Sequence, residues 1–156
     1  MSVRILWTSR HKPLKAQLEE LARIYGEYEL KQYSGFVPNA EWLVEYVKKH
    51  GFDVVVPVLP LTIIAEFVQH ANREGVTVLW AEMKQVKMTY SPPVPGRDYN
   101  PEWETVVMTR DSNGVETWKV MRFVKFHRIL GVELKLEPVG NINIQKIPNM
   151  KQGETS

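Results

Sequence analysis

Five consecutive polar or cationic residues form the segment of this chain best suited to binding chemistry. They are Thr8, Ser9, Arg10, His11 and Lys12, and they follow an apolar run at 3–7 and precede Pro13, a residue favoured in the first turn of a helix. The free amides and the dipole of a helix start attract anions, and Arg and Lys side chains add formal charge. The sequence therefore predicts a site at residues 8–12 for a phosphate- or carboxylate-bearing ligand.

The same five residues also suit an ordinary loop between a strand and a helix. In that interpretation Thr8 or Ser9 caps the helix, and the cationic side chains are solvated. The segment contains no Gly, whereas P-loop and dinucleotide sites need Gly for close backbone approach, so we expect no standard NAD, FAD or ATP site. Ser9 and His11 alone do not make a catalytic pair, because a third group must orient the base.

Two further segments are expected near this site. Residues 57–62 form a rigid apolar loop that suits either the wall of a pocket or plain packing. Trp80 ends a predicted strand at 76–80 and Glu82 lies two residues later, near the same edge. Glu82 is a weak catalytic candidate, as a general base or a ligand of a ribose hydroxyl. A Glu at a strand end is also commonly solvated or paired with a neighbour such as Lys84.

A rival chemistry comes from Glu133-Leu134-Lys135, which lies on a predicted strand at 132–136. These three residues resemble the Glu-x-Lys element of restriction-type nucleases. The resemblance implies Mg²⁺ held by carboxylates, with Lys135 stabilising the attacking water or the transition state. Such nucleases also need an upstream Asp on a neighbouring strand, whereas Asp111 lies in a predicted turn and Asp98 in a Pro-rich loop.

Basic and aromatic residues are mixed between residues 118 and 128, a composition that suits a nucleic-acid surface. Successive residues of a strand point to opposite faces, so Arg122 and Arg128 lie on one face and Lys119 and Lys125 on the other. This arrangement favours a solvated strand over a one-sided basic patch. The remaining histidines, at His50, His70 and His127, lack metal-ligand spacing, so no metal site is predicted.

Length and composition favour one self-sufficient domain. The chain has 156 residues, 44% hydrophobic and 24% charged, which are ordinary values for a globular protein. A formal net charge of +2 gives no support to a nucleic-acid or membrane partner through bulk electrostatics, and the absence of Cys excludes disulfides and thiol chemistry. No segment resembles a signal sequence or a membrane span, so we expect a cytoplasmic protein.

Residues 1–90 predict a βαβαβαβ unit. Apolar residues recur at helical spacing from Leu14 to Tyr25, with Gln17 on the polar side, and again in helices that Asn39 and Pro60 or Thr62 introduce. Strands are predicted at 3–7, 28–33, 52–56 and 76–80. The second strand alternates polar and apolar residues, which indicates an edge strand of the sheet. The expected fold is a Rossmann-like parallel sheet of order 2-1-3-4 with helices on both faces.

The second half of the sequence predicts loops and antiparallel strands in place of alternating strands and helices. Residues 91–103 form a Pro-rich loop, residues 104–139 a C-terminal antiparallel β-meander around a turn at 111–114, and residues 140–156 a flexible tail. The meander is expected either to extend the sheet past the fourth strand or to cover one face. Residues 1–139 would then make a single α/β domain.

Three functions stay open on this basis. The first is a small protein that binds an anionic, phosphate- or nucleotide-like ligand where the strand order reverses, at the carboxyl ends of the strands. The second is a Mg²⁺-dependent nuclease using Glu133 and Lys135. The third is a non-catalytic interaction module, a homodimer that associates through the meander or exposed aromatics such as Trp103 and Trp118.

Overall fold

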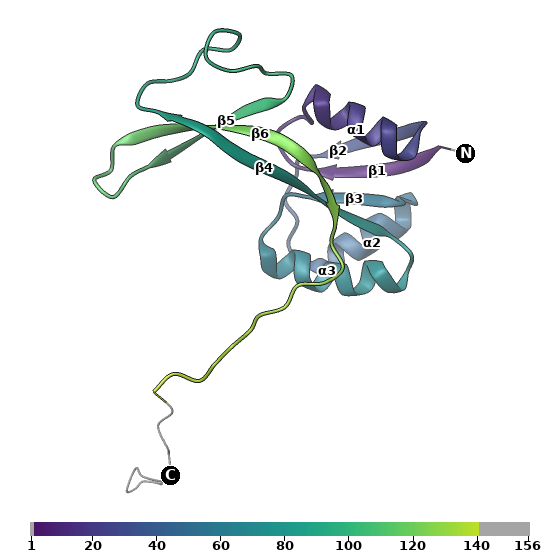
Figure 1. The fold of residues 1–156 in the computed structure, drawn as a ribbon. Helices are drawn as coiled ribbons and strands as arrows, with labels where there is room; N and C mark the ends of the chain where they lie inside the picture. Colours follow the sequence, from purple (N-terminus) through teal and green to yellow (C-terminus); the bar gives the residue numbers. More distant parts are fainter. Residues whose placement is uncertain (1, 141–156) are drawn as a thin grey trace, which may run out of the picture.

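A computed structural model describes residues 2–140 of the chain as a curled six-stranded sheet with three helices. Figure 1 shows the helices gathered around one half of the sheet, while the other half projects from them as a long arm. The strand order is β2-β1-β3-β4-β6-β5, so the predicted α/β class and the order 2-1-3-4 are confirmed.

The parallel half of the sheet is built by the first four strands. Its elements are β1 (Val3–Thr8), α1 (Lys15–Tyr25), β2 (Tyr28–Tyr33), α2 (Ala40–His50), β3 (Val54–Pro57), α3 (Leu61–Arg73) and β4 (Thr77–Thr89). β1 pairs in parallel with both β2 and β3, and β3 pairs in parallel with the first residues of β4. β2 is therefore an edge strand, as its half-polar sequence predicts.

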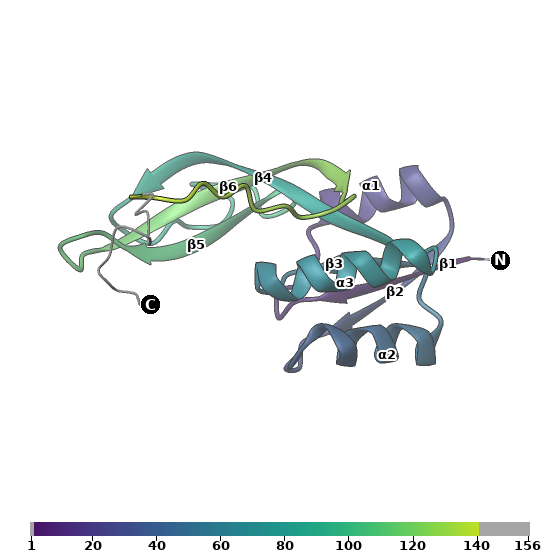
Figure 2. The same ribbon diagram turned by 90° about the horizontal axis from the view of Figure 1, so that it is seen from below.

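Each face of this half-sheet has its own core, because successive strand residues point to opposite faces. On one face Leu6, Val55 and Val78 pack against α2 and α3. On the other face Ile5, Trp7 and Val56 pack against Leu21 of α1. Figure 2 shows α1 on one side of the strands and α2 with α3 on the other, so the helices cover both faces as expected.

Local signals fix both ends of α2. The Oδ1 atom of Asn39 accepts a hydrogen bond from the backbone N–H of Trp42 at 2.8 Å, which caps the first turn. Gly51 ends the helix at φ 67°, a left-handed conformation that glycine adopts without steric cost.

The arm (residues 83–123) is the largest departure from the predicted elements. β4 does not end at Trp80 but continues to Thr89, and it pairs antiparallel with β6 (Glu116–Arg128) rather than with β5 (Glu104–Arg110). The added strands extend the sheet past β4, one of the two predicted placements. They do not form a meander in chain order, because β6 lies between β4 and β5.

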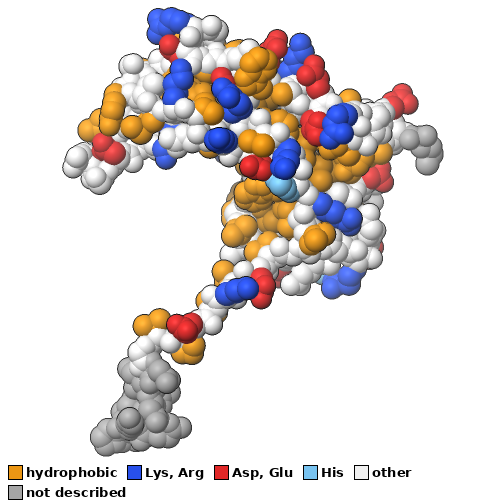
Figure 3. Space-filling model, viewed as in Figure 1, with side chains coloured by type: hydrophobic (Ala, Val, Ile, Leu, Met, Phe, Trp, Pro, Cys, Tyr) orange, Lys and Arg blue, Asp and Glu red, His pale blue; other side chains and the backbone are white. Residues whose placement is uncertain are grey.

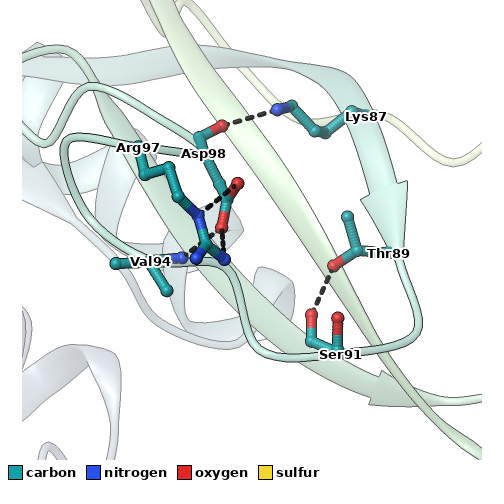
Figure 4. Close-up of polar contacts among 6 residues, drawn as sticks. All are labelled: Lys87, Thr89, Ser91, Val94, Arg97 and Asp98. Carbon is teal, nitrogen blue, oxygen red and sulfur yellow. Dashed lines mark hydrogen bonds and ion pairs between the residues drawn. The ribbon is translucent and has the colours of Figure 1, made fainter.

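The loop between β4 and β5 is held closed by its own polar contacts. Asp98 accepts a hydrogen bond from the Val94 N–H at 2.7 Å and pairs with Arg97 at 3.0 Å. Lys87 Nζ donates to the carbonyl oxygen of Asp98 at 2.6 Å, which joins the loop to β4 (Figure 4). The Pro-rich segment is therefore an ordered loop.

The predicted strand at 132–136 is wrong. Residues 129–140 follow β6 as a segment outside any strand. Ile129 and Val132 still pack against the core, and Figure 1 shows the segment passing α3 and then running away from the rest of the molecule. The alternation of apolar and polar residues there favours a strand, but no described strand pairs with it. The predicted tail at 140–156 lies, beyond residue 140, outside the described residues. None of the described helices has the length and apolarity needed to cross a membrane.

Candidate functional site

The β1–α1 loop is held in one conformation by three hydrogen bonds. The indole N–H of Trp7 donates to the carbonyl oxygen of His11 at 3.1 Å, and the backbone N–H of His11 donates to the hydroxyl of Ser9 at 3.0 Å. From the neighbouring strand, the amide of Gln32 donates to the carbonyl oxygen of Ser9 at 2.8 Å. The loop therefore has a fixed path although several of its side chains are exposed.

This loop borders two adjoining cavities at the carboxyl ends of β1 and β3. The larger has a volume of about 330 Å³ and the smaller about 130 Å³, and Ser9, Val58 and Leu59 line both. His11 and Lys12 line the larger cavity, whereas Thr8 and Arg10 line the smaller one. The five predicted site residues are thus divided between two neighbouring spaces.

The larger cavity is mainly apolar and aromatic. Trp7, Val56 and Pro57 come from β1 and β3, Leu14 comes from the start of α1, and Trp80 comes from β4. The edge strand β5 supplies a further part of the wall, at residues 105–107. Figure 3 shows hydrophobic side chains gathered in the hollow where the underside of the arm meets the rest of the sheet. The 57–62 loop forms part of this wall through Pro57, Val58 and Leu59.

The smaller cavity is polar and lies beside the edge strand. Arg10, Tyr33 and Ser34 line it, and Gly35 closes it. A Cβ atom added at Gly35 would lie 2.6 Å from the Tyr33 hydroxyl oxygen, so a larger residue there would displace the tyrosine ring. Phe36 follows directly in the sequence, and its side chain is exposed. The Tyr33 hydroxyl donates to the backbone carbonyl oxygen of Phe36 at 3.2 Å.

The cationic side chains of the loop have no anionic partner among residues 2–140. Arg10, His11 and Lys12 are exposed, and none of them forms a described ion pair or side-chain hydrogen bond. Thr8 differs, because its buried hydroxyl donates to the carbonyl oxygen of Val56 at 3.4 Å and accepts from the Val58 N–H at 3.2 Å. Thr8 therefore joins β1 to β3, while the three later residues stay available to a ligand.

Glu82, the weak catalytic candidate, lies on the arm side of this region. Its carboxylate lies 2.6 Å from His127 Nε2, across the β4–β6 ladder, and it is absent from the linings of both cavities. Glu82 is thus paired with a histidine of the neighbouring strand rather than with Lys84.

Glu133 and Lys135 lie in the extended C-terminal segment and not on a strand. Both side chains are exposed. Within residues 2–140 there is no group of three or more His, Asp or Glu side chains placed to hold a metal ion.

Sequence reasoning missed three parts of the larger cavity. Gln17, expected on the polar side of α1, is buried, and its side chain contributes to the cavity wall beside Met83. Its Oε1 atom accepts the Leu14 N–H at 2.8 Å, which satisfies the helix start. Trp7 was visible only as an apolar strand residue. Residues 105–107 lie far away in sequence, and no local pattern places them here.

Comparisons with protein-family models, with curated proteins and with solved structures found no match to this chain. The site is therefore interpreted from its own geometry.

Proposed function

We propose that this protein binds a small compound in which an anionic group, a phosphate or a carboxylate, is joined to a planar apolar group, as in a nucleotide. The ligand would lie across the carboxyl ends of β1 and β3, in the manner of a Rossmann-like sheet, where ligands occupy the crevice at the reversal of strand order. The observation that carries the proposal is the pair of adjoining cavities, one apolar and one polar, that share Ser9, Val58 and Leu59.

The apolar group fits the larger cavity. Small-molecule sites commonly have volumes of roughly 300–1,000 Å³, with apolar and aromatic walls and a few polar groups that set orientation. The cavity of about 330 Å³ lies at the small end of that range, and Trp7, Trp80 and Pro57 give it flat apolar surfaces. A single ring system is therefore the favoured occupant.

The anionic group fits the cationic loop. Arg10 lines the smaller cavity and Lys12 the larger one, and Ser9 lines both. The Ser9 hydroxyl accepts the His11 N–H, and within residues 2–140 its hydrogen is free to donate. A guanidinium group binds phosphate or carboxylate through two parallel hydrogen bonds, and an ammonium group adds charge without a fixed direction. Because the loop backbone is already fixed, little ordering cost is expected on binding.

Binding without catalysis is the form of the proposal that the site supports. The cavities offer hydrogen-bond donors and positive charge, whereas the carboxylate expected as a base, Glu82, is paired with His127 outside them. A sensor or carrier of the ligand needs only those donors.

The test uses 8-anilinonaphthalene-1-sulfonate, a fluorescent probe that joins aromatic rings to an anionic sulfonate. We expect saturable binding, with energy transfer from tryptophan, and displacement by nucleoside monophosphates more readily than by inorganic phosphate. Arg10→Ala and Lys12→Ala should each weaken binding about tenfold, since a charge-assisted hydrogen bond contributes about 1.5–3 kcal/mol.

The matched control is Lys49→Ala, which removes an exposed cation from the last turn of α2. Probe affinity should be unchanged in that variant. If Arg10→Ala and Lys12→Ala bind the probe and the nucleotides as tightly as the unmodified protein does, the anion site is not at this loop and the proposal fails.

A further inference from the structure

The extended C-terminal segment has the sequence pattern of a strand without a strand's partners. From residue 130 to 136 its apolar residues alternate with Gly131, Glu133 and Lys135, and the side chains of Leu130, Leu134 and Leu136 are at least three-quarters exposed, at 75%, 78% and 84%. Alternation with this degree of exposure is expected of a strand that is completed by another surface. None of the described strands pairs with it.

The sheet offers a matching free edge at β2. Among residues 2–140, β2 pairs with β1 alone, through a parallel ladder whose first bond runs from the Val3 N–H to the Glu27 carbonyl oxygen. In a parallel ladder alternate residues of a strand bond to one neighbour, so the N–H and C=O groups of Tyr28, Leu30 and Gln32 point away from β1. These groups form an unpaired backbone edge.

Charges on this edge are complementary to the segment in one orientation. Glu29 and Lys31 are two residues apart on β2, and Glu133 and Lys135 are two residues apart on the segment. An antiparallel alignment that sets Leu134 opposite Leu30 also sets Glu133 opposite Lys31 and Lys135 opposite Glu29. A parallel alignment with the same central pair would place like charges opposite each other, which destabilises a strand pair.

Both β2 charges are already held in place. Lys31 Nζ lies 5.5 Å from the centre of the Tyr46 ring, and Glu29 lies 3.6 Å from Arg4 at the surface. On the opposite face, Tyr28 and Leu30 are part-buried beside the α1 core. The antiparallel alignment therefore places the segment's leucines on the face where β2 is apolar, and its charges on the face where β2 is charged.

We propose that residues 133–136 add as an antiparallel strand to the β2 edge of a second copy of this chain. Val132 stays with its own chain, where its part-buried side chain packs against the core. The chain's own β2 is out of reach. The start of the segment is held beside β4 and α3, because the Ile129 N–H donates to the Val78 carbonyl oxygen at 2.8 Å and the Asn72 amide donates to the Leu130 carbonyl oxygen at 2.9 Å.

The distance from β4 to the free side of β2 shows why the segment cannot reach the β2 edge of its own chain. A position beyond β2 lies four strand spacings from β4 in the order β4-β3-β1-β2, about 19 Å at roughly 4.8 Å per spacing. From Leu130 to Glu133 the chain spans at most about 10 Å. The opposite edge, β5, carries its only charges at Glu104 and Arg110, six residues apart, so it cannot match a pair that is two apart.

Each copy has one donor segment and one acceptor edge, so a closed pair related by a two-fold axis satisfies both. Main-chain hydrogen bonds supply affinity in such strand addition, and the side chains select the partner and the register. This inference is independent of ligand binding at the cavities.

The first test is a charge-reversal cycle followed by sedimentation equilibrium over a wide concentration range. We expect the unmodified chain to dimerise, and Lys31→Glu or Glu133→Lys to weaken the dimer about tenfold each. The double variant restores an opposite-charge pair and should recover most of the loss. Glu66→Lys, at an exposed site on α3, is the control with the same charge change as Glu133→Lys. A strict monomer, or a double variant no better than the singles, overturns the proposal.

The second test uses the absence of natural Cys in the chain. Lys31→Cys combined with Glu133→Cys should give a covalent dimer on oxidation, because the two positions are directly opposite in the proposed register. Lys31→Cys with Val139→Cys should not. An internal disulfide in a monomer would show that the segment reaches its own sheet, and would overturn the assignment to a second copy.

Discussion

Glu104 is the one acidic side chain of the described residues that is buried, and its partners explain how this is tolerated. One carboxylate oxygen accepts the Asn100 N–H at 2.7 Å, and the other accepts from Nε and Nη2 of Arg122 at 2.9 and 2.7 Å. The hydrogen bond from Asn100, and then the Arg122 guanidinium, hold the pKa of the carboxyl below its ordinary value, although burial opposes this.

The lowered pKa of Glu104 makes the free energy of unfolding depend on pH. At acid pH the unfolded chain binds more protons at this position, so the stabilisation is present above the unfolded pKa and is lost as pH falls through the folded pKa. We expect Glu104→Gln to lower stability by about 2 kcal/mol at neutral pH. The difference from the unmodified protein should shrink toward pH 3.

Urea denaturation at a series of pH values measures this difference. Glu116→Gln is the control, because Glu116 pairs with Arg110 at 3.0 Å on an exposed surface, where an ion pair contributes little. A constant difference between Glu104→Gln and the unmodified protein at all pH values would show that the charge of Glu104 does not stabilise the fold.

At the scale of single residues, the sequence identified charge but not burial. Arg10 and Lys12 could be recognised by type as candidates for binding an anion, because a helix start attracts anions and cationic side chains beside it add charge. The burial of Gln17 could not be predicted, because a Gln on a helix gives no local sign that the arm packs against it. Its buried amide accepts the Leu14 N–H and donates to the Met83 sulfur, and Met83 is distant in sequence.

At the scale of elements, the helices were predictable because their signals are local. A cap at Asn39, a stop at Gly51 and apolar residues at helical spacing lie within a few residues of one another. The length of β4 also had a local signal, since Ala81 and Met83 alternate with Glu82 and Lys84. Its pairing with β6 had none, because that pairing joins residues about forty apart.

The same reasoning explains the error at 132–136. Alternation there is real, but a strand exists only where a partner lies beside it, and the partner is not named by the pattern. The structure leaves this segment extended and unpaired within residues 2–140.

The β4–β5 loop provides a prediction at the element scale. Asp98→Ala removes the acceptor of the Val94 N–H and the partner of Arg97, so the Val94 amide should exchange with solvent faster and trypsin should cleave at Arg97 more readily. Asp98→Asn keeps an acceptor oxygen, so its exchange and cleavage rates should fall between those of Asp98→Ala and those of the unmodified protein. Both effects are measured by hydrogen exchange and timed proteolysis.

Asp111→Ala is the matched control for this loop. Asp111 accepts the N–H groups of Asn113 and Val115 in the β5–β6 turn, so its loss should speed exchange there and leave Val94 unchanged. If Asp98→Ala leaves the Val94 exchange rate unaltered, the carboxylate does not hold the loop closed.

At the scale of the whole molecule, the larger cavity depends on contacts between distant parts of the chain. Its walls come from the β1–α1 loop, from β3 and from β5. The arm is joined to the start of α1 where the Ala16 N–H donates to the Glu102 carbonyl oxygen at 2.9 Å, and Lys15 lies 3.7 Å from the Glu102 carboxylate. The curl of the sheet thus brings an edge strand over the carboxyl ends of β1 and β3.

This arrangement predicts that a ligand in the larger cavity stabilises the arm as well as the loop. Ligand at one hundred times its dissociation constant stabilises the binding-competent state by about 2.7 kcal/mol, and amides that exchange only when this site opens are protected accordingly. With the naphthalene sulfonate probe near saturation, we expect slower hydrogen exchange at residues 105–107 and at residues 57–59. The hairpin tip at 112–114, which lines neither cavity, is the internal control and should not change. Protection confined to residues 8–10, 33–35 and 58–59 would place the ligand in the smaller cavity alone and would exclude the arm from the site.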